Sequence, residues 1–169
     1  CRSPEDVQGK GESRGNSGIK IHEAYEIQIL DSYGDSSNPK GLAGSVYKQH
    51  APLVNACRKP GEWQSYDIVF RAPRFDVGGS LRRHGTFTVL HNGVLVQNAV
   101  SPVGPTGWLK REHYSAHADK LPLALQDHGN PVRYRNIWIR ELGADAARAE
   151  FTYSTTVLDR FAGRFQAAD

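Results

Sequence analysis

Tyr25-Glu26-Ile27-Gln28-Ile29-Leu30-Asp31 alternates apolar and polar side chains, as a half-buried β-strand does. The odd-numbered side chains from Tyr25 onward would point to one face, and Glu26 and Gln28 to the other. Asp31 breaks the alternation, and a β-bulge between Gln28 and Asp31 would return it to the face of Glu26. The same pattern is equally typical of an exposed polar sheet face, with Asp31 starting a turn. Periodicity alone leaves both interpretations open.

Length and composition limit the classes of protein to which the chain can belong. Its 169 residues suit one domain with a sizeable core, and its net charge is only +3. The basic residues are scattered, which does not favour nucleic-acid binding. No apolar run approaches the roughly 20 residues that span a bilayer, so no transmembrane segment is expected. Cys1 and Cys57 could form one disulfide, and two free thiols are equally compatible with the sequence.

The other strand signals are short and are separated by loops of very unequal length. We expect strands at residues 45–48, 63–70, 86–91, 94–97, 121–127 and 132–140. Asn92-Gly93 is a strong hairpin signal, and a tight connection at Glu23-Ala24 would pair residues 19–22 with the opening stretch. About eight short strands predict an all-β fold, an antiparallel β-sandwich or jelly roll.

The end of the chain has a different character. Residues 143–150 are Ala-rich and predict a short helix, and residues 157–161 predict the start of a second. We therefore expect a jelly-roll domain over residues 1–142 and a short helical tail or linker over residues 143–169. The absence of an initiator Met and of a signal-like segment is typical of a mature or trimmed fragment.

Six segments, in order and with similar spacing, resemble the 3-keto-disaccharide hydrolase domain family. They are Arg14-Gly15-Asn16-Ser17-Gly18, residues 25–32, residues 61–68, His91-Asn92-Gly93, residues 125–129 and Arg135-Asn136-Ile137. The resemblance implies a concanavalin A-like jelly roll, related in shape to laminarinase-type glycoside hydrolases. It also implies that several N-terminal strands of the family are missing, so that either the chain was cut or another chain or segment supplies them. The family's second cysteine, in the loop around residues 38–44, is absent, which leaves Cys57 without that partner.

Glu26-x-Gln28-x-x-Asp31 is similar in spacing to the Glu-x-Asp-x-x-Glu motif of laminarinase-type enzymes. A retaining glycosidase needs two carboxyl groups about 5–5.5 Å apart. Strand geometry places the backbones of Glu26 and Asp31 roughly 13 Å apart, and Gln28 removes a charge that could tune its neighbours. We therefore do not expect the ordinary two-carboxylate mechanism.

The resemblance implies a different chemistry, in which a ketone at C3 of the sugar makes the neighbouring C2–H removable. A base takes that proton, an acid protonates the departing oxygen at C1, and water then adds to the enone. His128 suits the base, because imidazole titrates near pH 6.5, and Glu26 or Asp31 suits the acid or a metal ligand. Arg135, or a divalent cation such as Ca or Mn, suits the enolate oxygen.

The remaining candidates are side chains that would bind the substrate. Tyr47 and Trp108 lie next to long loops and suit stacking against a sugar. The expected substrate-binding set is Gln28, Arg135, Asn16, Tyr47 and Trp108. Arg135 could instead be a cross-strand ion-pair partner, Asn16 could only cap a turn, and His128 could be a surface turn residue. His113 and His117 are spaced like metal ligands, but a pair alone is a weak signal.

Two functions therefore compete. The first is a carbohydrate-active hydrolase that cleaves 3-keto-glycosides or 3-keto-disaccharides. The second is a non-catalytic carbohydrate-binding module of a larger exported protein, since fold alone does not separate the two. A scaffold domain without a site is a weaker third. In each of the first two the expected partner is a saccharide, and the expected location is extracytoplasmic, periplasmic or secreted.

Overall fold

The computed structural model describes residues 1–109 and 112–143. The chain forms two compact units, Cys1–Arg135 and Asn136–Asp169, and all the strands described below belong to the first. The predicted helical tail begins at residue 143 and otherwise lies outside the described residues. The predicted domain boundary after residue 142 stays a prediction. No described helix is long and apolar enough to cross a membrane.

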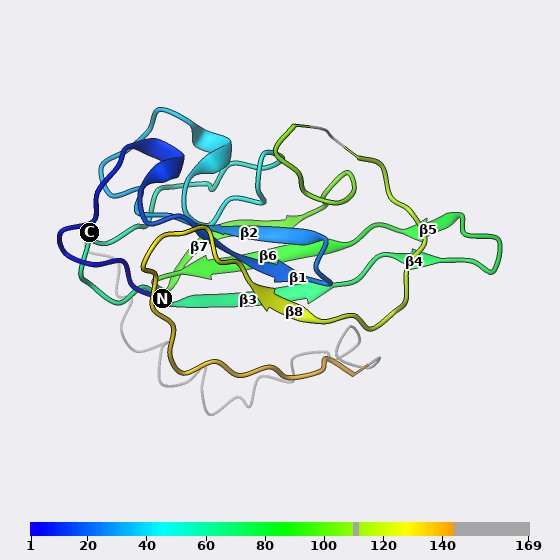
Figure 1. The fold of residues 1–169 in the computed structure, drawn as a ribbon. Helices are drawn as coiled ribbons and strands as arrows, with labels where there is room; N and C mark the ends of the chain where they lie inside the picture. Colours follow the sequence, from blue (N-terminus) through cyan, green and yellow to red (C-terminus); the bar gives the residue numbers. More distant parts are fainter. Residues whose placement is uncertain (110–111, 144–169) are drawn as a thin grey trace, which may run out of the picture. The chain divides into compact units, whose positions relative to one another are not determined.

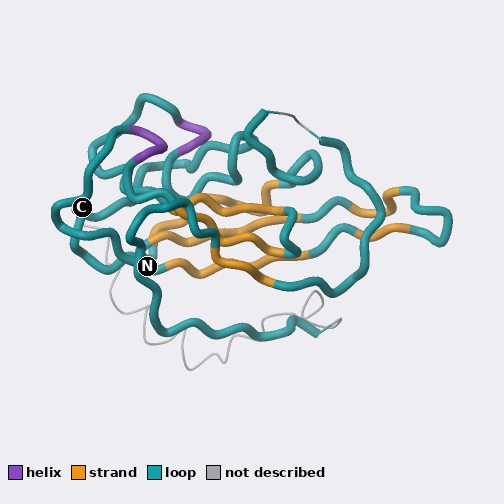
Figure 2. Tube along the Cα trace, in the orientation of Figure 1, coloured by secondary structure: helices purple, strands orange, loops and turns teal. Residues whose placement is uncertain are grey.

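The first unit is built from short antiparallel strands, which confirms the all-β prediction (Figures 1 and 2). One sheet has the order β2-β1-β8, a second has the order β3-β6-β7, and β4 pairs with β5 in a separate two-stranded ribbon. Two 3₁₀ turns, η1 and η2, precede β1 and follow β2. The bounds are η1 Gly11–Ser13, β1 Ser17–Ile21, β2 Tyr25–Ile29, η2 Pro39–Gly41, β3 Tyr66–Arg71, β4 Arg74–Phe75, β5 Leu81–Arg83, β6 Thr86–His91, β7 Val94–Val100 and β8 Leu123–Leu125.

The core lies between the two three-stranded sheets. Tyr25 and Ile27 of β2 and Phe87 and Val89 of β6 are fully buried in one hydrophobic cluster, with Val96 of β7. Because side chains alternate along a strand, the even-numbered residues of β2 face away from this core. All five residues of β2 are nevertheless buried, so the polar face is covered as well.

Several expected strands differ in the structure. Within residues 45–48 only Val46 makes isolated bridges, to Ile27 and His50, and β3 begins at Tyr66 rather than at residue 63. Of residues 132–140, the structure gives only Arg133 a bridge. The β4–β5 ribbon was not predicted, because its strands are too short to show an alternation of apolar and polar residues in the sequence. The Asn92-Gly93 turn is confirmed: both residues have positive φ and join His91 to Val94.

The β1–β2 connection is one residue longer than expected. Ile21 pairs with Tyr25, and His22 and Glu23 in the loop adopt φ of 56° and 54°. A connection limited to Glu23-Ala24 would have paired Lys20 with Ile27 and turned it toward the core. The extra loop residue instead places Lys20 opposite Glu26, because a shift of one residue reverses every side chain.

Candidate active site

Glu26 lies at the centre of the polar face of the β2-β1-β8 sheet. Only 5% of the residue is exposed, and Nζ of Lys20, its cross-strand partner, lies 4.0 Å from its Oε2. The Glu26 side chain lies over Gly18, where any Cβ would collide with Oε1. Its backbone N–H donates to Oγ1 of Thr106 at 3.0 Å. Strand register and a glycine together therefore hold one carboxyl group in a position that is almost closed to solvent.

The environment of Glu26 favours its protonated form. Burial raises the pKa of the Glu26 carboxyl, because the charged form loses its hydration. The positive charges of Lys20 and His128 oppose this rise, and the negative charge of Glu12 adds to it. The net direction is upward, which suits a group that must carry a proton near neutral pH.

Glu12 of η1 brings a second carboxylate to the same region. It accepts a hydrogen bond from Nδ2 of Asn38 at 2.5 Å and one from the hydroxyl of Tyr47 at 3.2 Å, and it forms an ion pair with Nζ of Lys48. These contacts also hold the Tyr47 hydroxyl in place beside the Glu12 carboxylate. Burial, and secondarily the charge of Glu12, raises the pKa of the Tyr47 phenol.

Gln28 and Asn16 extend the polar face next to Glu26. Nε2 of Gln28 donates to Oδ1 of Asn16 at 3.1 Å, and Nδ2 of Asn16 donates to the carbonyl of Glu12 at 2.6 Å. Oε1 of Gln28 and Oγ of Ser45 are buried and have no hydrogen-bond partner among the described residues. Buried polar atoms are rarely left in this state, so both could form a hydrogen bond with a buried water.

His128 approaches Glu26 from the turn that follows β8. It is exposed, and its positive charge lowers the pKa of Glu26, which places it within electrostatic range of that carboxyl. The turn itself is fixed by the N–H of Gly129, which donates to Oδ1 of Asp127 at 2.9 Å. Tyr134 reaches the same region, bonds Oγ of Ser17 at 2.5 Å and is influenced by the charge of Glu26.

Asp31 does not join this group. The β1–β2 register is continuous through Ile29, and its continuation would pair Asp31 with Gly15. The N–H of Asp31 donates instead to the carbonyl of Arg14, at 3.0 Å. The extra residue thus lies on the Arg14–Gly15 side, and the predicted bulge between Gln28 and Asp31 is wrong. The Asp31 carboxylate instead pairs with Nε of Arg14 at 2.7 Å.

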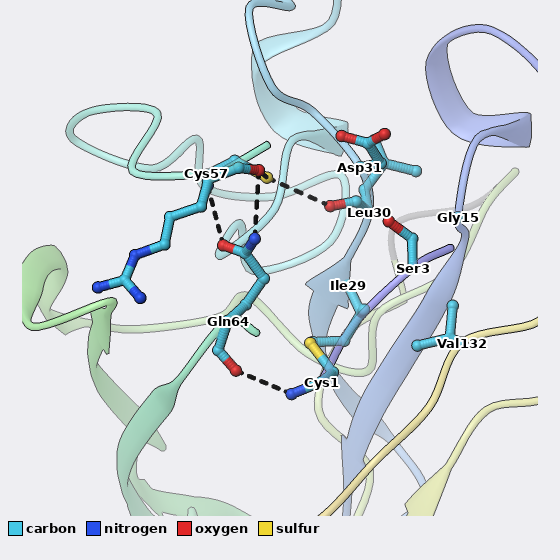
Figure 3. Close-up of a pocket in the computed structure, with 10 residues that line it drawn as sticks. Cys1, Ser3, Gly15, Ile29, Leu30, Asp31, Cys57, Gln64 and Val132 are labelled. Atoms are coloured by element: carbon cyan, nitrogen blue, oxygen red, sulfur yellow. Dashed lines mark hydrogen bonds between the residues drawn. The ribbon is translucent and has the colours of Figure 1, made fainter. Parts of the chain in front are cut away.

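Asp31 lines a different, very small cavity of about 10 Å³ (Figure 3). Cys1, Cys57 and Gln64 also line it, and the two cysteines are free thiols. Burial raises the pKa of the Cys57 thiol. The space is about that of one water molecule, so this cavity does not accept a sugar.

Arg135 and Trp108 also lie apart from Glu26 in the contacts of the described residues. The guanidinium carbon of Arg135 lies 3.9 Å from the ring centre of Trp63. Trp108 is 69% exposed, and no hydrogen bond or ring contact among the described residues connects it to the Glu26 group. The polar face therefore brings together five of the predicted residues: Asn16, Glu26, Gln28, Tyr47 and His128.

The described residues do not supply a cation site of the expected kind. No group of three His, Cys, Asp or Glu side chains within residues 1–109 and 112–143 is placed to hold a metal ion. His117 is engaged elsewhere, since its Nε2 bonds the hydroxyl of Tyr25 at 2.9 Å and its Nδ1 bonds the carbonyl of Ala118 at 2.8 Å.

Comparison with known proteins identifies a family and one similar fold. The 3-keto-alpha-glucoside-1,2-lyase-like domain family matches residues 6–140. A crystal structure from Parabacteroides distasonis, named "putative glycosyl hydrolase", shares 45% identity with a TM-score of 0.72. That match covers 77% of this chain and 55% of the other, so the chain spans just over half of that protein.

A second structure from the same organism carries the same name. It shares 20% identity with a TM-score of 0.44, and the match covers 68% of this chain and 64% of the other, which is too distant to bear on the site. Among curated protein sequences, none matches the chain.

Proposed function

Because the chain belongs to the 3-keto-alpha-glucoside-1,2-lyase-like domain family, we propose that it cleaves the glycosidic bond of 3-keto-glycosides by elimination and hydration at Glu26. The observation that carries this proposal is the buried Glu26 carboxyl with its raised pKa, flanked by Lys20 and His128. A site that only recognised neutral sugars would have no need of a desolvated carboxyl beside a lysine and a histidine.

The elimination begins at C2 of the keto sugar. His128 in its neutral form takes the C2 proton, and the electron pair moves into the C2–C3 bond as negative charge develops on the C3 ketone oxygen. The positive charge of Lys20 stabilises that oxygen, which is the role that the sequence had suggested for Arg135. The pair then forms the C1=C2 bond, the C1–O bond breaks, and Glu26 gives its proton to the departing oxygen.

Hydration reverses the proton transfers. Glu26, now a carboxylate, removes a proton from a water molecule whose oxygen bonds to C1, and the C2 carbanion equivalent takes a proton from His128. The products are the free 3-keto sugar and the released alcohol, with both side chains restored. Gln28, Asn16 and Tyr47 line the same face and would bind the sugar hydroxyls.

The test is to incubate the protein with 3-keto-trehalose and with a 3-keto-glucoside and to measure free 3-keto-glucose. We expect release by the wild type and a rate at least about 100-fold lower in Glu26→Gln and in His128→Ala, because each removes one proton transfer. The matched control is Glu62→Gln, an exposed carboxyl distant in sequence from the polar face, which should leave the rate unchanged. A parallel reaction with a chelator separates chemistry by side chains alone from chemistry that needs a divalent cation at the enolate oxygen.

Two outcomes would contradict the proposal. One is full activity in both Glu26→Gln and His128→Ala. The other is binding of 3-keto-trehalose without any release of product, which would instead assign the chain to the carbohydrate-binding modules.

A further inference from the structure

Arg2, near the start of the chain, lies directly opposite Arg133 in an isolated antiparallel bridge. The N–H of Arg2 donates to the carbonyl of Arg133 at 2.9 Å, and the N–H of Arg133 donates back to the carbonyl of Arg2 at 2.9 Å. Residues that exchange both bonds in an antiparallel pair carry their side chains on the same face. Like charges placed directly opposite are unfavourable, so this pair calls for a compensating group.

The described part of the chain does not supply that group as an ion pair. No Asp or Glu within residues 1–109 and 112–143 forms a salt bridge with Arg2, Arg133 or Arg135, whereas Arg14, Arg74 and Arg82 each have one. Glu5 lies nearby and is exposed, but it forms no such bridge among these residues either.

Trp63 and Arg135 extend the arginine pair into a larger basic surface. Arg135 lies 3.9 Å from the Trp63 ring centre and Arg2 lies 5.2 Å from it. A guanidinium stacked on an aromatic ring keeps its N–H edge free to bind an anion. Tyr134, between the two later arginines, turns instead to Ser17, so Arg133 and Arg135 are separated from the Glu26 face.

A cavity of about 230 Å³ opens at this surface. It is lined by Arg2, Ser3, Pro4, Glu5, Gly61 and Arg133, so two arginines and a single acidic residue contribute to its wall. The volume far exceeds that of the cavity beside Asp31, which leaves room for more than a bare anion. Paired guanidinium forks match an oxyanion with two or three acceptor oxygens.

We propose that Arg2, Arg133 and Arg135 form a second binding site, which takes the carboxylate or sulfate ester of an anionic saccharide. The oxyanion part of this ligand follows from the arginines alone, and the saccharide part rests on the proposed function. The site would hold a charged sugar unit at a place separate from the Glu26 face.

Calorimetric titration of the full chain at low ionic strength tests the site without any need for turnover. The probes are a tetragalacturonate for the carboxylate, a sulfated disaccharide for the sulfate ester, neutral cellotetraose and inorganic sulfate. We expect one of the two charged saccharides to bind and the two reference probes to bind at least about tenfold more weakly. Cellotetraose lacks the charge that accepts charge-assisted hydrogen bonds from the arginines, and inorganic sulfate lacks the sugar that would contact the rest of the cavity. Affinity should fall by about tenfold in Arg133→Gln, while Arg83→Gln, an exposed arginine of β5, should match the wild type.

Arg133→Gln keeps the backbone pair with Arg2, and circular dichroism checks that it folds. The proposal is overturned if neither charged saccharide binds, or if Arg133→Gln and Arg83→Gln weaken binding equally. It is also overturned if inorganic sulfate, or a DNA oligonucleotide of equal charge, binds as tightly as the saccharide. Loss of 3-keto-glycoside cleavage alone would not affect it, because the readout is binding.

Discussion

At the scale of single residues, the properties of Glu26 come from its neighbours. The same side chain on an exposed strand would be an ordinary carboxylate, but burial against Gly18 raises its pKa in spite of the opposing charges of Lys20 and His128. Lys20 is the neighbour whose influence can be isolated, because it lies 4.0 Å away and on the adjacent strand.

Lys20→Gln should move the pH dependence of the reaction. The Lys20 charge favours the carboxylate and so lowers the pKa of Glu26; its removal raises that pKa further. If Glu26 is the acid, activity declines as pH rises through its pKa, so the alkaline side of the kcat/KM profile should shift to higher pH. The maximum should also fall, because the ketone oxygen loses its cation.

The control for this shift is Lys59→Gln, an exposed lysine of a surface loop. Its profile should overlay the wild type. A profile of Lys20→Gln that shifts to lower pH, or does not shift, would count against Glu26 as the proton donor.

At the scale of elements, the β1–β2 hairpin sets the register that makes the site. The alternation of the opening stretch correctly indicated a strand with Glu26 and Gln28 on one face. It could not indicate that His22 joins the loop, because non-glycine residues rarely adopt positive φ and the sequence carries no glycine there. Lys20 was therefore missed as a neighbour of Glu26, although a three-residue loop would have predicted it.

Glu23→Gly should stabilise the protein. Glu23 has a φ of 54°, which costs a side-chain-bearing residue roughly 1–2 kcal/mol and costs glycine little. After the greater chain entropy of glycine in the unfolded state, a net gain of about 0.5–1 kcal/mol remains, or a Tm higher by about 1–4 °C. Thermal unfolding measures it.

Glu23→Ala is the matched variant, since it also removes the carboxylate but keeps a Cβ. It should show no comparable gain. Equal stabilisation by both variants would mean that charge, rather than backbone conformation, is responsible.

At the scale of the whole molecule, the core holds a histidine that should make the stability of the fold depend on pH. His91 of β6 is fully buried, stacks on Tyr66 with ring centres 4.4 Å apart, and has both ring nitrogens without a hydrogen-bond partner among the described residues. Burial is the main cause that lowers its pKa to about 4. The core therefore keeps this imidazole neutral.

The fold should consequently lose stability as pH falls from about 6.5 toward 4. In this range the unfolded state binds a proton at His91 and the folded state does not, so the free energy of the unfolded state falls relative to that of the folded state. At pH 5 the loss relative to pH 7 should be on the order of 2 kcal/mol from this residue. Urea unfolding of the wild type and of His91→Phe at both pH values measures the difference.

His91→Phe keeps an aromatic ring against Tyr66 and should show a smaller decline between the two pH values. His113→Gln, at an exposed position, should decline as the wild type does. Equal declines in all three proteins would place the acid sensitivity elsewhere.

The sequence by itself determined the all-β class, the Asn92-Gly93 turn and the faces of β2, because each follows from local alternation or turn chemistry. The family resemblance rested on six short segments in order, and its assignment of Glu26, Gln28 and His128 to one site stays a prediction. Only the tertiary structure decided that Glu12 and Lys20 join them, while Asp31 turns to Arg14 and Arg135 to Trp63. These partners depend on register and on loops packed from distant parts of the chain, which leave no periodic trace in the sequence.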